Sequence, residues 1–220
     1  MNYNVSFNTD FRRNPYKGRF IVIEGMDGSG KTTQAKRLVE YLEEKKIESV
    51  YTKEPTDEIT GKLIRKILSG KLALAPVAFQ YLFAADRAVH QVEISSYLEK
   101  GITVVSDRYF WSSAVYGMVD RETSKENDRE RILVALSILS MYHRFLLPDC
   151  TFYLKVSTQE AVRRIDKKAE ELEIYEEKEK LEKIREGYEW LAKKFTKEIA
   201  IIDGEKSVEE VTHAIVASIK

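Results

Sequence analysis

One short stretch of the sequence limits the possible folds more than any other. Four mostly apolar residues, Phe20 to Ile23, run directly into the pattern Gly25-x-x-x-x-Gly30-Lys31-Thr32. In this pattern backbone N–H groups curl around phosphate oxygens, the lysine reaches the outer phosphates and the hydroxyl can ligate Mg²⁺. A strand before it and a helix after it are the context that the pattern requires. The stretch therefore predicts a nucleotide-binding α/β fold rather than a chance glycine-rich turn.

Apolar runs alternate with helical patterns along the rest of the chain. Several runs are apolar at consecutive positions, which is typical of strands that are covered on both faces. Since helical segments separate the runs, the sequence predicts a five-stranded parallel sheet flanked by helices. The expected strands are Phe20 to Ile23, Ile47 to Thr52, Ile102 to Ser106, Thr151 to Val156 and Ile199 to Ile202.

The expected helices follow from periodicity and from residues that start or stop helices. The first should begin at Lys31, so that the positive end of its dipole faces the phosphates. Proline just inside the start and glycine just past the end mark a long helix. The helices after the first are expected at Gly61 to Leu68, Pro76 to just before Gly101, and Glu130 to Leu147, where Pro148 ends the last. Ser157 with Glu160, and Ser207 with Glu210, each predict a capping box that opens a helix.

Length and composition limit the class of protein. The 220 residues suit a single domain over 19–220. Residues 1–18 show neither the helical nor the strand pattern of apolar residues, so we expect them to form a flexible extension. The 36 basic and 36 acidic side chains cancel, so global charge gives no argument for nucleic acid or an anionic membrane as a partner. The single cysteine, Cys150, fits a reducing compartment, and we expect a cytoplasmic protein.

Further candidate site residues follow the expected strands. Asp107 comes at the carboxyl end of a buried strand, where open α/β sheets bind ligands, and Arg108 follows it. An acid at this position supports Mg²⁺ in phosphate-loop enzymes, so Thr32 and Asp107 are the candidate metal residues. On the long helix Phe83 and Arg87 are four residues apart and share a face, which suits a planar base with a neighbouring hydrogen-bond donor.

Taken together, these motifs resemble those of the thymidylate kinase family. The matching segments occur in family order over residues 20 to 210. They are Glu24-Gly-Met-Asp-Gly-Ser-Gly-Lys-Thr-Thr33, Glu54-Pro-Thr56 followed by Ile64-Arg65, Leu82-Phe-Ala-Ala-Asp-Arg87, Asp107-Arg-Tyr109 with Ser112-Ser-Ala-Val-Tyr116, and Pro148-Asp149 before Phe152-Tyr-Leu154. The resemblance implies a three-layer phosphate-loop kinase fold with a short lid at about residues 163–176, a homodimer, and phosphoryl transfer from ATP to dTMP with Mg²⁺.

The resemblance also implies roles for individual residues. Phe83 would stack on thymine, Arg87 would donate to its O4 edge, Ser113 would face the same edge, and Tyr116 would disfavour a ribose 2′-hydroxyl. Arg108 would hold the acceptor phosphate, with Lys53 and Arg65 as candidates for helping it, and Asp27 would hold the sugar 3′-hydroxyl. Glu54 would belong to the substrate site. The donor nucleotide would bind to Gly25, Asp27, Gly28, Ser29, Gly30, Lys31, Thr32 and Thr33.

Two positions depart from the family pattern. One class of the family has arginine where this chain has Gly28, and the other class supplies the cation from the lid. We therefore expect a lid cation, with Arg164, Lys167 and Lys168 as candidates, to act in catalysis beside Lys31, Asp27 and Arg108. Gly117 stands where many members have glutamine near the base.

Other functions compete with this interpretation. Another nucleotide kinase or a deoxynucleoside kinase would share the loop, the Mg²⁺ and the lid. A non-enzymatic nucleotide-binding regulator would share only the loop, and it would have no use for an acceptor site built from Phe83, Arg87 and Arg108. A nucleic-acid ATPase is disfavoured by zero net charge and the lack of a basic stripe.

Overall fold

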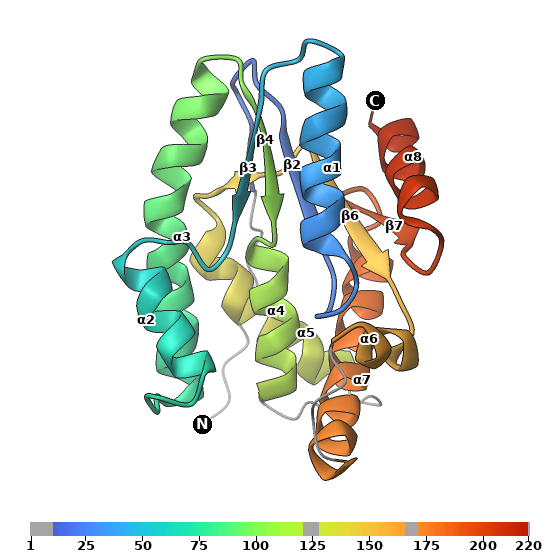
Figure 1. Ribbon diagram of the computed structural model, residues 1–220. Coiled ribbons are helices and arrows are strands. Elements are labelled where there is room, and N and C mark those ends of the chain that lie inside the picture. Colours follow the sequence, from blue (N-terminus) through green and yellow to red (C-terminus); the bar gives the residue numbers. More distant parts are fainter. Residues whose placement is uncertain (1–10, 121–127, 166–170, 220) are drawn as a thin grey trace.

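The structure is a computed structural model that describes residues 11–120, 128–165 and 171–219. Its centre is a five-stranded sheet in which every pair of neighbours is parallel, in the order β3-β4-β2-β6-β7 (Figure 1). The strands are β2 (Phe20–Glu24), β3 (Ser49–Lys53), β4 (Thr103–Asp107), β6 (Cys150–Lys155) and β7 (Ile199–Asp203). The predicted parallel sheet and the positions of its strands are confirmed.

Helices cover both faces of this sheet. The first three along the chain are α1 (Lys31–Glu44), α2 (Ile59–Leu68) and α3 (Pro76–Glu99). The others are α4 (Phe110–Asp120), α5 (Asp128–Leu139), α6 (Thr158–Ile165), α7 (Glu171–Lys194) and α8 (Val208–Ser218). Within the described ranges, no helix combines the length and the apolar content that crossing a bilayer needs.

The alternation of side chains along β2 divides the core into two layers. Ile21 and Ile23 pack with side chains of α1 and α8 on one face of the sheet. Phe20 and Val22 pack on the other face with side chains of α3, α4, α5 and α7. Because both faces of the strand are buried, its sequence is apolar at four consecutive positions. This is the pattern on which the strand prediction depends.

The register of the sheet brings three strand ends together. Ile23 of β2 and Lys53 of β3 both lie opposite Asp107 of β4. The segments that follow these strands therefore start at one edge of the sheet, beside the N-terminus of α1 (Figure 1). Ligands of open α/β sheets bind at this edge.

The helix expected from Glu130 to Leu147 is wrong in its second half. Helix α5 ends at Leu139 and is followed by a 3₁₀ turn, η1 (Ser140–Tyr142), and by a short strand, β5 (Leu146–Leu147). The backbone N–H of Leu146 donates to Gln91 Oε1 at 3.0 Å. Strand β5 also pairs in parallel with β1 (Arg12–Arg13). Contacts with distant residues thus replace the helical hydrogen bonds, which the apolar pattern alone could not reveal.

Residues 11–18 are packed against the domain, in contrast to the flexible extension that the sequence suggested for them. The ring of Phe11 stacks on Phe110 with centroids 5.6 Å apart. Asn14 Nδ2 donates to Asp149 Oδ2 at 2.7 Å and to the Gly18 carbonyl at 2.8 Å. Residues 1–10 lie outside the described ranges.

The two predicted capping boxes have different outcomes. At α8 the Ser207 and Glu210 side chains each accept from the other's backbone N–H, so the box is confirmed. At α6 the Glu160 N–H donates to Ser157 Oγ at 3.3 Å, but the return bond is absent. The Ser157 N–H donates to Glu205 instead, at 2.7 Å, while the Glu160 carboxylate binds arginines of its own helix.

Candidate active site

The phosphate-binding loop joins β2 to α1, as predicted. Gly30 has φ of 92° directly before the first helical residue, a conformation that suits glycine. Lys31 Nζ donates to the Met26 carbonyl at 2.7 Å and lies 3.7 Å from Asp27 Oδ1. Burial, together with the nearby Arg108 charge, lowers the pKa of Lys31 to about 8. The lysine is therefore held inside the loop, where its ammonium group can bind an anion.

Thr32 and Asp107 meet at the mouth of the loop. The Thr32 hydroxyl donates to Asp107 Oδ2, while Asp107 Oδ1 is buried without a hydrogen-bond partner in the described chain. A hydroxyl beside an unpaired carboxylate oxygen fits the oxygen ligands that Mg²⁺ takes, directly or through water. No group of three or more His, Cys, Asp or Glu that could hold a metal occurs among the described residues. Mg²⁺ in phosphoryl-transfer sites usually keeps waters and substrate phosphates as its remaining ligands.

Arg108 follows β4 in a left-handed conformation, with φ of 76°. Its backbone N–H donates to the Ile23 carbonyl at 3.0 Å, and its carbonyl accepts from Ser106 Oγ at 2.8 Å. Such a conformation costs roughly 1–3 kcal/mol in a residue other than glycine and persists only where surrounding contacts enforce it. These bonds direct the guanidinium toward the phosphate loop.

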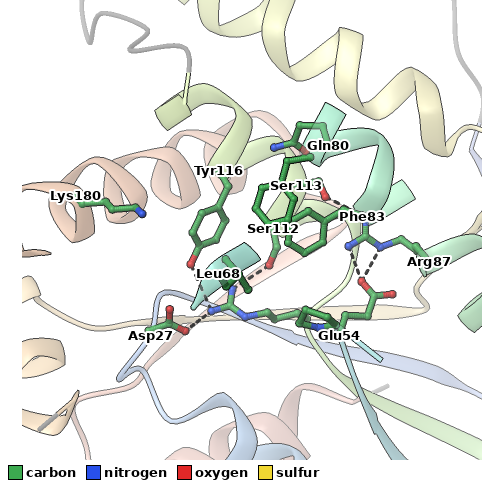
Figure 2. Close-up of a pocket in the computed structure, with 13 residues that line it drawn as sticks. Asp27, Glu54, Leu68, Gln80, Phe83, Arg87, Ser112, Ser113, Tyr116 and Lys180 are labelled. Atoms are coloured by element: carbon green, nitrogen blue, oxygen red, sulfur yellow. Dashed lines mark hydrogen bonds and ion pairs between the residues drawn. The ribbon is translucent and has the colours of Figure 1, made fainter. Parts of the chain in front are cut away.

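The Arg108 guanidinium bridges the loop and α4. Nη2 lies 2.5 Å from Asp27 Oδ1, and Nη1 donates to Ser112 Oγ at 3.1 Å (Figure 2). Burial alone would raise the pKa of Asp27, but the charges of Arg108 and Lys31 lower it. Asp27 stays 65% exposed, so both the carboxylate and the arginine beside it remain accessible to a ligand.

Glu24 supports the site through buried hydrogen bonds, and it was not among the site residues expected from the sequence. Its buried carboxylate accepts from the Tyr109 N–H at 2.9 Å, from Ser112 Oγ at 2.7 Å and from the Tyr188 hydroxyl at 2.8 Å. Burial raises its pKa. These bonds fix the start of α4, which carries the groups around Arg108. An acid between an apolar strand and a glycine-rich loop was the available signal.

Arg87 lies in an almost fully buried network. Its Nη2 and Nε are 2.5 and 2.6 Å from Glu54 Oε2, and His90 Nδ1 is 3.0 Å from Glu54 Oε1. Its Nη1 donates to Ser113 Oγ at 3.0 Å, and its guanidinium carbon lies 4.7 Å from the centroid of the Tyr142 ring. Because most of the N–H groups of Arg87 point at such partners, the arginine can lie buried on the same face of the helix as the phenylalanines.

A cavity of about 300 Å³ lies between the phosphate loop, α3 and α4 (Figure 2). It brings together seven predicted site residues, namely Asp27, Glu54, Phe83, Arg87, Arg108, Ser113 and Tyr116. The ring of Phe83 packs on Phe79, with centroids 4.8 Å apart, so that an aromatic wall faces polar groups on α4. The size and the mixed wall suit a planar base with an attached phosphate.

Two predicted substrate residues lie outside the walls of this cavity. Arg65 donates to the Pro55 carbonyl and to Asp57 Oδ1, each at 2.9 Å. Lys53 lies 3.8 Å from the other oxygen of Asp57. Both cations are thus paired with Asp57, and neither is part of the cavity wall.

Comparison with known proteins agrees with this geometry. The model of the family described as thymidylate kinase matches residues 23–215. The chain belongs to the thymidylate kinase family. It is 38% identical over 213 residues to a probable thymidylate kinase of Thermococcus gammatolerans, covering 92% of this chain and 96% of the relative. It is 34% identical over 200 residues to a thymidylate kinase of Carboxydothermus hydrogenoformans, covering 89% and 93%.

A solved thymidylate kinase shares the fold. The structure of the enzyme from Candida albicans aligns with a TM-score of 0.76 and 27% sequence identity, over 92% of this chain and 91% of that one. The family assignment and the phosphate-loop kinase fold expected from the sequence are therefore confirmed.

A second cavity, of about 400 Å³, lies on the far side of the phosphate loop. Its walls include Ser29, Gly30 and Thr33 of the loop region, and Arg164 of α6. Arg164 donates to Glu160 Oε1 at 2.7 Å and to the Gly204 carbonyl at 3.1 Å, and its Nη1 is 3.5 Å from the Gly28 carbonyl. Arg164 is one of the three candidates for the expected lid cation of this thymidylate kinase family member, and through the Gly28 carbonyl it contacts the phosphate loop. Lys167 and Lys168 lie outside the described ranges.

Two glycines singled out in the sequence, Gly28 and Gly117, both lie against neighbouring helices. At Gly28, with φ of 78°, an added Cβ would lie 2.5 Å from the Ala161 carbonyl oxygen of α6. At Gly117 an added Cβ would lie 1.9 Å from Ile138 Cδ1 of α5. The backbone of α6 therefore excludes a side chain at Gly28, whereas at Gly117 the end of the Ile138 side chain would have to move.

Proposed function

We propose that this member of the thymidylate kinase family transfers the γ-phosphoryl group of ATP to dTMP, with dTMP in the 300 Å³ cavity and ATP in the groove across the loop. The observation that carries the proposal is the Arg108–Asp27 pair, which stands where the phosphate loop meets the acceptor cavity. A cation at that junction suits a reaction in which two phosphate-bearing substrates must meet.

The donor half of the site consists of the loop and its neighbours. The backbone from Gly25 to Thr33, including Gly28, Ser29 and Gly30, would hold the ATP phosphates, and Lys31 would neutralise the outer ones. Thr32 and Asp107 would hold Mg²⁺, which would supply neutralisation of the phosphate charge when bound. Arg164, on the wall of the second cavity, would contact the donor nucleotide.

In the acceptor half of the site, Arg87 and Ser113 each keep a hydrogen that can be donated to the substrate. Of the five guanidinium N–H groups of Arg87, four are engaged by Glu54, Ser113 and the Tyr109 carbonyl. One N–H on Nη1 remains to donate to a base carbonyl. The Ser113 oxygen accepts from both Arg87 and Tyr142, so its own hydrogen is also left to donate. Phe83 would stack on the ring, and Tyr116 would lie beside the sugar.

The chemistry needs alignment and charge more than covalent help from the protein. An oxygen of the dTMP phosphate bonds to the γ-phosphorus as the bond from that phosphorus to the β–γ bridging oxygen breaks, which leaves ADP. Arg108 would hold the acceptor phosphate in line, and Lys31 would stabilise the transferred group. No side chain acts as a nucleophile. Lys168 or Lys167 remain candidates for an added lid cation.

An acceptor panel tests the proposal. Coupled release of ADP is measured with ATP and each of dTMP, dUMP, dCMP, AMP and thymidine. We expect ADP release that depends on dTMP. Phosphorylation of thymidine itself would indicate a nucleoside kinase, and ATP binding without acceptor-dependent turnover would indicate a regulator. Either outcome would reject the proposal.

We also propose a homodimer formed through the outer face of α3 and α5. Val77 and Tyr81 on α3 are 53% and 62% exposed, and Leu133 on α5 is 61% exposed. Large apolar side chains gathered on one surface are typical of association sites. Sedimentation or light scattering of Tyr81→Asp beside the unaltered chain tests this, with a shift to monomer expected.

We also propose a cytoplasmic location, which the single cysteine supports.

A further inference from the structure

One polar group in the acceptor cavity has no assigned role. Gln80 lies on α3, three residues before Phe83 and seven before Arg87, so all three side chains share a face of the helix. Gln80 lines the cavity and is only 9% exposed (Figure 2). Its Oε1 is buried and has no hydrogen-bond partner within the described ranges. An unpaired buried polar atom of this kind destabilises the folded protein, so its presence needs an explanation.

The packing of α4 shows where the Gln80 carboxamide lies. The position of a Cβ built on Gly117 is 3.6 Å from Gln80 Nε2, so the amide occupies space beside this glycine. Ser113, which accepts from Arg87, is one helical turn earlier on α4. Neighbours one turn apart are roughly 5–6 Å from each other. Arg87 and Gln80 therefore lie beside neighbouring turns of α4, Arg87 at Ser113 and Gln80 at Gly117.

The chemistry of a carboxamide matches one kind of base edge. It presents a carbonyl and N–H groups side by side, which complements the N3–H and the adjoining carbonyl of thymine. Because Oε1 has no partner, a half-turn of the carboxamide brings the oxygen to the cavity without breaking a hydrogen bond at that end. Arg87 can only donate, so it favours a carbonyl at position 4 over the amino group of cytosine.

We propose that Gln80 is a specificity-determining residue whose carboxamide pairs with the N3–H edge of the acceptor's base. The inference rests on the proposed function and adds to it the group that reads the base beside Arg87. In the free protein the carboxamide oxygen is unsatisfied, and substrate binding supplies its partner.

The test compares Gln80→Leu with a matched variant on the same helix, Gln91→Leu. Gln91 Oε1 accepts from the Tyr109 hydroxyl at 2.5 Å and from the Leu146 N–H at 3.0 Å, and Gln91 is not in the cavity wall. Gln80→Leu should raise KM for dTMP about 10- to 100-fold, leave KM for ATP unchanged and lower the preference for dTMP over dCMP. Gln91→Leu should lower the thermal midpoint but leave that preference unchanged.

A second readout needs no turnover. Gln80→Leu should keep or raise the thermal midpoint of the free protein, because it removes an unpaired buried group, while the upward shift caused by dTMP should shrink. An unchanged dTMP shift and an unchanged preference would overturn the inference. So would equal use of dTMP and its N3-methyl derivative by the unaltered enzyme, a result that holds even if the variant fails to fold. If the unaltered enzyme did not use dTMP at all, the proposed function would fail instead.

Discussion

Glu54 and Arg87 form an ion pair that solvent hardly reaches, with 3% and 2% of the two side chains exposed and Nη2 2.5 Å from Oε2. The pair joins the segment after β3 to the middle of α3, and through Ser113 it reaches α4. Although burial would lower the pKa of Arg87, the Glu54 charge raises it, so the cation persists in the buried site. The acceptor cavity is therefore shaped by a pair that must stay complete.

Removing one partner of this pair should be costly. Glu54→Ala leaves a buried guanidinium without its counter-ion, so we expect the free energy of unfolding to fall by about 3–5 kcal/mol, measured by urea denaturation. Asp57→Ala is the control, because Asp57 is 75% exposed and pairs with Arg65 at the surface. That change should cost at most about 1 kcal/mol. Equal losses in the two variants would contradict the buried pair's importance.

Lys31 should impose a pH limit on ATP use. Its pKa of about 8 in the folded protein predicts that kcat/KM for ATP falls as pH rises through 8, because the free enzyme then loses this charge. Between about 8 and the ordinary lysine pKa of 10.5 the unfolded chain binds more protons, so the free energy of unfolding should rise with pH over that range. Lys31→Met should lack both trends and lose about 10²- to 10³-fold in kcat.

Asp107→Asn should weaken the response to Mg²⁺. The change removes the carboxylate charge beside Thr32, so half-maximal activity should need about tenfold more Mg²⁺, measured by titration at fixed ATP. Asp203→Asn is the control, since Asp203 ends the last strand of the same sheet and accepts from the Glu205 N–H, away from Thr32. A normal Mg²⁺ requirement in the first variant would remove Asp107 from the metal site.

Arg164 and Arg163 offer a matched pair on α6. Both bind Glu160, but only Arg164 also reaches the Gly28 and Gly204 carbonyls, while Arg163 is 71% exposed. Arg164→Ala should lower kcat/KM for ATP about 10- to 100-fold, and Arg163→Ala should change it less than about threefold. Steady-state kinetics with varied ATP would show this, and similar effects of both changes would move the cation elsewhere in the lid.

Phe11 tests the attachment of the N-terminal segment. Phe11→Ala removes the ring that stacks on Phe110, and it should cost about 1–3 kcal/mol of stability because the site is only partly buried. Arg12→Ala, at an exposed position of β1, should have little effect. Thermal melts of the two variants provide the comparison, and an unchanged midpoint for Phe11→Ala would show that the segment contributes nothing to the fold.

The strands and the loop could be predicted because their information is local. β2 is apolar at successive positions since both of its faces are covered, and Gly25 to Thr32 spells out a loop whose backbone does the binding. The end of α5 could not be predicted, because Leu146 pairs with a residue more than a hundred positions earlier in the chain. The apolar pattern of the residues around Leu146 does not reveal a partner so far away in the sequence.

The same distinction applies to the site. Phe83, Arg87 and Arg108 could be named because spacing and strand ends placed them. Glu24 and Gln80 could not, since each is recognised by what surrounds it in the described part of the chain. Three donors surround the Glu24 carboxylate, and no donor there meets the Gln80 amide oxygen. Arg65 and Lys53 were placed at the substrate by resemblance, whereas the fold pairs both with Asp57.

The contact between Gly28 and Ala161 has a consequence for where the catalytic cation can be placed. Arginine cannot be introduced at position 28 while α6 keeps its place, because its first side-chain carbon would collide with a backbone oxygen. In this chain a loop arginine would therefore require α6 to shift as well, so the choice between a loop cation and a lid cation is coupled to the position of a helix.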